Sequence, residues 1–182
     1  MLRPIEYLGA KWRHLALPRA HSAGHKVFLA VPEHKSQRRG PRMTYVKIDD
    51  PDVVDFLVAR AAGQDPEDTL WQGTAYTWRR RMAKLVGTLT GDPKLVIPSS
   101  LRPGGATWFF ETHGERIDLL MWRGRWACQR TLGHYIQELQ VHQVLQDLPL
   151  EKMNVIEKLE ELFSGCLRDA CAQPARPGDM GG

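Results

Sequence analysis

Apolar residues recur along the chain at the intervals of short helices, except in one region where they favour strands. In Leu2–Leu15 the apolar positions share one helical face, and Pro4 falls within the first turn, where a helix tolerates proline. Lys26–Val31 and Thr44–Ile48 are short β-prone runs joined by a basic, glycine-containing segment. The pattern therefore predicts a helix over residues 2–15 followed by an antiparallel hairpin.

Two further helices are marked by residues at their ends. Asp50 can act as an N-cap and Pro51 as the first helical residue, so a helix is expected from there to about Gly63. The apolar residues of Thr74–Leu89 lie on one face with basic residues opposite, which predicts an amphipathic helix. It should stop before Pro93.

The remaining chain is expected to be helical as well. Ser99 or Ser100 can cap a helix that contains Arg102 and ends at Gly114. Further helices are expected at about residues 116–123, 129–148 and 151–171. The fold class is therefore mainly α with a small antiparallel β-sheet. Residues 1–148 are expected to form one domain, 149–171 an amphipathic helix, and 172–182 a disordered, Pro/Gly-rich tail.

Composition narrows the class of protein. The chain has 182 residues, 42% of them apolar, which is enough for a core of ordinary size. The sequence shows no apolar run long enough for a transmembrane helix and no signal peptide, so an intracellular protein without a membrane partner is expected. Its three cysteines form no CxxC pair, so neither a disulfide framework nor a zinc site is expected.

Charge adds a candidate partner. The formal net charge is only +4, but the basic residues are grouped. Local positive patches bind polyphosphates by releasing condensed counterions, so the grouping favours nucleic acid, and solvated surface is the alternative for any one cluster. The clusters are Lys35, Arg38, Arg39 and Arg42; Arg79, Arg80, Arg81 and Lys84; and Arg116, Arg123, Arg125 and Arg130.

The segment from Ser99 to Tyr135 carries the most specific pattern. Arg102 follows a Ser-Ser helix start, Trp126 follows Gly-Arg, and Tyr135 comes 9 residues after Trp126 (135 − 126) and 33 after Arg102 (135 − 102). This pattern resembles the C-terminal signature of the tyrosine recombinase (phage integrase) family. The resemblance covers residues 3–135.

Six positions match the family's motifs in order. Arg3-Pro4-Ile5-Glu6 resembles the first arginine box, Lys35 the hairpin lysine, Ser99-Ser100-Leu101-Arg102 the His-x-x-Arg box, and Trp126 and Tyr135 the last two positions. The resemblance implies the fold of the DNA breaking-rejoining enzymes. It also implies double-stranded DNA as the partner, in the nucleus of a eukaryote or the cytoplasm of a bacterium.

The implied activity is cleavage and rejoining of DNA strands through a covalent 3′-phosphotyrosine at Tyr135. Arg3 and Arg102 would bracket the charged phosphate oxygens, because guanidinium groups bind them bidentately. Lys35 would protonate the leaving 5′ oxygen, with Lys26 and the neighbouring arginines as competing candidates. Trp126 can donate only through its indole N–H. The phosphotyrosine stores the bond energy, so the resemblance implies no metal, ATP or other cofactor.

The DNA-binding residues expected around this site are Arg38, Arg39, Arg42, Arg79, Arg80, Arg123 and Arg125. In the resembled family a C-terminal helix often packs onto a neighbouring protomer, so a homo-oligomer on DNA is one expectation for residues 149–171. A helix that completes its own core is the other.

The sequence departs from the family at two places. Ser99 replaces the usual histidine, and its hydroxyl is a weaker proton acceptor than an imidazole. His113 and His134 are candidates to take over this role. The first arginine box lies at the beginning of the sequence, so a catalytic domain truncated at its N-terminus is expected. The alternatives are a catalytically weak or inactive DNA-binding remnant of a mobile-element integrase, and a type IB topoisomerase-like enzyme.

Overall fold

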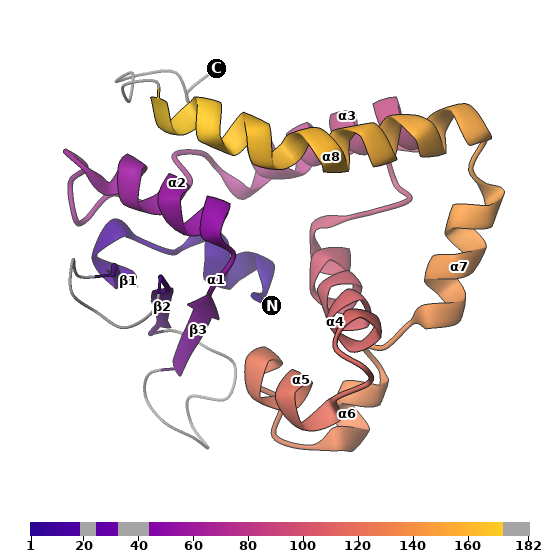
Figure 1. Ribbon diagram of the computed structural model, residues 1–182, viewed down its shortest axis with the longest axis horizontal. Helices are drawn as coiled ribbons and strands as arrows, with labels where there is room; N and C mark the ends of the chain where they lie inside the picture. The colour runs from indigo at the N-terminus through magenta and orange to yellow at the C-terminus, as the bar shows by residue number, and fades with distance from the viewer. Residues whose placement is uncertain (19–24, 33–43, 173–182) are drawn as a thin grey trace. The chain divides into compact units, whose positions relative to one another are not determined.

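The computed structural model describes residues 1–18, 25–32 and 44–172 (Figure 1). These residues are mainly helical and contain a small antiparallel sheet, as predicted. None of their helices is long and apolar enough to cross a membrane. The helices are α1 (Pro4–Leu8), α2 (Pro51–Ala61), α3 (Ala75–Thr90), α4 (Leu101–Thr112), α5 (Ile117–Gly124), α6 (Gln129–Gly133), α7 (Glu138–Asp147) and α8 (Leu150–Ala172).

The chain divides into two compact units. The first unit comprises Met1–Pro4 and Ala75–Lys158, and the second comprises Ile5–Thr74 and the chain from Leu159 onward. Each unit is described separately below. The expected boundaries at residues 148 and 171 stay a prediction.

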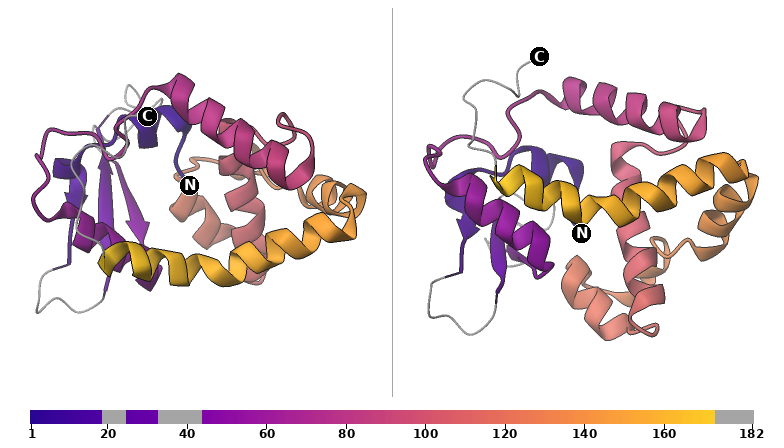
Figure 2. Two further views of the ribbon diagram at one scale, coloured as in Figure 1. Left: turned by 90° about the horizontal axis from the view of Figure 1, so that it is seen from above. Right: turned by 45° about the horizontal axis from the view of Figure 1, so that its top comes forward.

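The second unit contains the sheet, whose strands lie side by side in the order β1-β2-β3 (Figure 2). They are β1 (Leu15–Ala16), β2 (Val27–Val31) and β3 (Thr44–Ile48). β2 and β3 pair antiparallel, with Leu29 opposite Val46, so the predicted hairpin is confirmed. Alternate residues of β2 are buried, which places one face of the sheet in the core of this unit.

The prediction of one helix over residues 2–15 is wrong. α1 ends at Leu8, a 3₁₀ turn follows at Trp12–His14, and the chain then enters β1. The cause is pairing with a distant segment. Leu70 N–H donates to Ala10 O at 2.8 Å and Trp12 N–H donates to Asp68 O at 3.0 Å, so these backbone groups are satisfied outside a helix.

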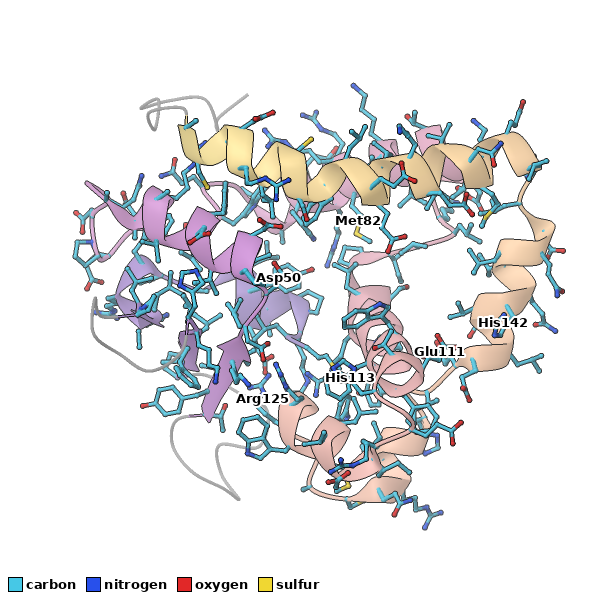
Figure 3. The ribbon with its side chains drawn as sticks, viewed as in Figure 1. Asp50, Met82, Glu111, His113, Arg125 and His142 are labelled. Carbon is cyan, nitrogen blue, oxygen red and sulfur yellow. The ribbon has the colours of Figure 1, made fainter. Side chains whose placement is uncertain are left out.

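α2 begins as its sequence predicts. The Asp50 carboxylate, at the start of the helix in Figure 3, accepts a hydrogen bond from Val53 N–H at 3.0 Å. Polar contacts then join α2 to the end of α8. Arg60 Nη2 donates to Ala170 O at 3.2 Å, and Arg168 Nη1 lies 3.1 Å from Asp52 Oδ1. Within the first unit, Lys152 Nζ of α8 donates to Thr88 O of α3 at 3.1 Å.

The first unit is built around α4, α5 and α6. Its core consists of Ala106, Phe109, Leu120, Trp126 and Leu132. The predicted helices at 74–89, 102–113 and 116–123 are confirmed as α3, α4 and α5. Ser100 occupies the N-cap position of α4, as predicted, but its side chain makes no capping hydrogen bond. The Ser100 hydroxyl instead accepts from Ile97 N–H at 3.3 Å.

The predicted helix over residues 129–148 is also wrong, because it is interrupted around Tyr135. α6 ends at Gly133 and α7 begins at Glu138. Tyr135 N–H donates to Leu132 O at 2.7 Å in a tight turn, and the amide of Gln137 is bonded by a side chain of α4. Tyr135 therefore lies between two helices and not on one.

α5 ends where the backbone makes a left-handed turn. Arg125 has φ 58° and ψ 43°, and Trp126 N–H donates to Met121 O at 3.0 Å, as in a Schellman motif. The motif folds the Trp126 indole back over Gly124, which is buried. A Cβ on Gly124 would lie within this ring, so no other residue fits here without displacing Trp126.

Gly124→Ala is expected to destabilise the first unit by at least about 2 kcal/mol, because the new methyl group overlaps the Trp126 ring in a packed core. Chemical denaturation followed by circular dichroism measures the effect. Gly104→Ala in α4 is the matched control. A Cβ there meets no atom within 4 Å, and alanine favours the helix by up to about 1 kcal/mol. Equal stability of the two variants would contradict this account of Gly124.

Candidate functional site

Arg102 is a charged residue almost completely buried in the first unit. Its side chain on α4 is 4% exposed. Nη1 donates to Met1 O at 2.6 Å and Nη2 donates to Gly124 O at 2.7 Å. A buried cation needs such partners, since an uncompensated charge is costly to remove from water. Arg102 therefore joins the N-terminal segment, α4 and the end of α5.

Two aromatic rings complete the surroundings of Arg102. Its Cζ atom lies 4.6 Å from the centre of the Trp126 ring and 5.6 Å from that of Tyr135. The two rings pack on each other, with centroids 5.2 Å apart and an interplanar angle of 52°. The structure thus brings together the three residues singled out by their spacing. An arginine facing aromatic rings gains cation–π attraction in addition to its hydrogen bonds.

Arg3 and Ser99, the other predicted catalytic residues that the structure describes, both belong to the first unit. Arg3 is half-buried, immediately before α1, and belongs to the same unit as Arg102. It is two residues from Met1, whose carbonyl contacts Arg102. Ser99 is exposed in the 3₁₀ turn one turn before Arg102. Both positions are compatible with the expected roles, which stay predictions.

The predicted hairpin residues Lys35, Arg38, Arg39 and Arg42 lie outside the described residues. Their assignment to catalysis and DNA binding stays a prediction.

The other predicted DNA-binding residues differ in surroundings. Arg79 and Arg80 are exposed on α3. Arg123 is half-buried, with Cζ 5.6 Å from the Phe109 ring centre, and Arg125 is half-buried in the left-handed turn. The α3 arginines are therefore the more accessible of these four to a phosphate backbone.

The third basic cluster is partly neutralised within the chain. Arg116 donates two hydrogen bonds to Asp118, at 2.9 and 2.6 Å. These bonds lower the pKa of Asp118 to about 2, so the carboxylate is ionised at neutral pH. This internal pairing makes Arg116 a weaker candidate for DNA than Arg79 or Arg80.

His113 and His134, the candidate proton acceptors in place of Ser99, differ in their surroundings. The His113 ring stacks on Phe109, with centroids 3.9 Å apart, and its Nδ1 lies 2.9 Å from Thr112 Oγ1. His134 is exposed in the turn after α6. His142 of α7 faces Glu111 of α4, with Nε2 4.0 Å from Oε1 (Figure 3). No group of three or more metal-ligating side chains occurs in the part of the chain described.

Sequence reasoning missed two residues that hold this cluster. Gly124 supplies a carbonyl to Arg102 and space for the Trp126 ring. Thr107, 1% exposed on α4, accepts a hydrogen bond from Gln137 N–H at 2.9 Å. For Gly124, the Gly-Arg-Trp sequence at residues 124–126 was a signal that sequence reasoning could have used. Nothing local marks Thr107, because its partner lies 30 residues away.

Two glycines, Gly104 and Gly105, follow Arg102 on α4. Gly104 faces open space, and a Cβ on Gly105 would make an ordinary 3.6 Å contact with Met1 Cγ. Helix packing therefore does not require either glycine.

Arg102→Lys is expected to lower the free energy of unfolding by about 2 kcal/mol, because one ammonium cannot replace a fork that bonds two carbonyls and stacks on Trp126. Urea denaturation provides the measurement. Arg123→Lys, at a half-buried arginine beside Phe109, is the control and should cost less than about 1 kcal/mol. Equal losses of unfolding free energy in both variants would contradict the contribution assigned to the Arg102 contacts.

No protein-family model, curated protein or solved structure matches the chain. The resemblance to the tyrosine recombinases rests on the residues described above.

Proposed function

We propose that the first unit contains the centre of a tyrosine recombinase that cleaves and rejoins DNA through Tyr135. The observation that carries this proposal is the packing of Arg102, Trp126 and Tyr135 around one another, within 4.6–5.6 Å. These residues are spread over 33 positions (135 − 102) and match the family's order. A guanidinium beside a phenol is the minimum that tyrosine attack on a phosphodiester requires.

The reaction exchanges one phosphate ester for another. The Tyr135 oxygen bonds to phosphorus and loses its proton, while the bond to the 5′ oxygen breaks and that oxygen takes up a proton. Arg102 stabilises the negative charge that develops on the non-bridging oxygens. Attack by a 5′ hydroxyl on the phosphotyrosine reverses the step and rejoins the strand. The proton donor assigned by resemblance is Lys35.

Burial of Arg102 sets a condition on this mechanism. Two of its donor nitrogens already bond the carbonyls of Met1 and Gly124. These bonds use two of the five N–H donors of a side chain that is 4% exposed, so a phosphate can reach the guanidinium only if the groups around it move. The Met1 carbonyl belongs to the short N-terminal segment of the unit, and the Met1 side chain packs against the core that contains Trp126, so movement of this segment would also alter the core.

The same burial favours a second candidate function, a DNA-binding remnant without turnover. In that case Arg102 serves only to hold α4 against the end of α5, and DNA binds through exposed arginines such as Arg79 and Arg80. The two functions differ in one observable, the covalent bond to DNA.

Tyr135→Phe is expected to abolish a covalent protein–DNA adduct that the unaltered chain forms on a nicked suicide duplex. Phenylalanine keeps the ring packed on Trp126 but lacks the nucleophilic oxygen. Denaturing gel electrophoresis measures the adduct, and Tyr76→Phe, at a 71% exposed tyrosine on α3, should leave it unchanged. Salt-sensitive DNA binding without any adduct would select the remnant. Relaxation of supercoiled DNA without site preference would select the topoisomerase-like alternative.

Arg80→Glu is expected to weaken DNA binding about tenfold or more and to reduce the salt dependence of the affinity by about one phosphate contact. Fluorescence anisotropy at several salt concentrations measures both quantities. Lys94→Glu makes the same charge change at an exposed residue outside the basic clusters. If the two variants bind equally well, α3 is not the DNA-binding surface.

A further inference from the structure

The backbone around Tyr135 is held by a single side chain from α4. The Thr107 hydroxyl accepts a hydrogen bond from Gln137 N–H at 2.9 Å and lies within donating distance of Tyr135 O, at 3.4 Å. Gln137 is the N-cap residue of α7, immediately before the helix begins at Glu138. One hydroxyl therefore contacts both ends of the short link that carries Tyr135 between α6 and α7.

This use of a helical threonine differs from others in the chain. Thr88, Thr90 and Thr112 each donate to the carbonyl four residues earlier in their own helix, at 2.7–2.9 Å. Such local bonds are the common arrangement for threonine in helices. The Thr107 hydroxyl instead reaches 28 and 30 residues along the chain, from a position that is 1% exposed.

Thr107 lies on the same helix as the arginine that faces the Tyr135 ring. The same helix carries Arg102, whose guanidinium faces the Tyr135 ring at 5.6 Å. Tyr135 is not on a helix, so helical geometry does not fix its backbone. The ring contacts with Trp126 constrain the side chain, whereas the Thr107 hydroxyl constrains the main chain from which that side chain projects.

We propose that Thr107 is a positioning residue, which fixes the Tyr135 link to α4 and so holds the phenol beside Arg102 for attack on DNA. The reactive role of the phenol rests on the proposed function. The clamp itself is a property of the folded chain without DNA. Thr107 touches no reacting atom, and it acts only through the backbone of residues 135–137.

Thr107→Val and Thr107→Ser separate the hydroxyl from the rest of the side chain. Valine keeps the shape of threonine and removes both contacts, whereas serine keeps the hydroxyl and loses a methyl group. The first readout is amide hydrogen exchange of Gln137 by NMR, with the Leu120 amide as a core reference, bonded to Arg116 O at 3.0 Å. The second is the rate of adduct formation on the suicide duplex at saturating DNA.

In Thr107→Val we expect Gln137 exchange to accelerate about fivefold or more relative to Leu120. The adduct rate should fall about tenfold with unchanged DNA affinity, while Thr107→Ser stays near the unaltered chain in both measurements. Unchanged Gln137 exchange in the valine variant would overturn the clamp. Faster exchange with an unchanged adduct rate, or equal losses in both variants, would overturn the positioning role. Absence of any adduct from the unaltered chain would refute the proposed function and leave the exchange measurement to decide the clamp.

Discussion

The burial of the Arg102 guanidinium is the constraint on which the rest of the first unit depends. A charge that is 4% exposed is stable only if its hydrogen bonds are made inside the protein. Arg102 obtains them from the carbonyls of Met1, in the N-terminal segment, and of Gly124, at the end of α5. The Trp126 ring covers the guanidinium at 4.6 Å. These contacts require the N-terminal segment, α4 and α5 to meet at one place.

The arrangement around Arg102 extends outward through its partners. Gly124 supplies a carbonyl to Arg102. The space that a Cβ on Gly124 would occupy is filled by the Trp126 ring. Trp126 supports Tyr135, and Thr107 fixes the backbone behind it. In the proposed function, the packing and hydrogen bonds that stabilise the buried cation also restrict its access to a phosphate.

Sequence reasoning succeeded where the controlling interactions are local. The Asp50 cap and the end of α4 shortly before Gly114 follow from neighbouring residues, and the hairpin strands follow from their composition. The convergence of Arg102, Trp126 and Tyr135 was expected from spacing and family resemblance. In contrast, residues 10–13 pair with residues 66–70, and Thr107 bonds the Gln137 amide where a continuous helix was expected. Partners so distant in sequence leave no periodic signal, which is why these features were missed.

Mass spectrometry of the DNA-linked peptide tests the central claim most directly. The protein is trapped on a nicked duplex and digested, and the nucleotide-bearing residue is located by fragmentation. The account predicts a 3′-phosphonucleotide on Tyr135. A nucleotide on any other residue, or protein that binds the duplex but carries none, would contradict it.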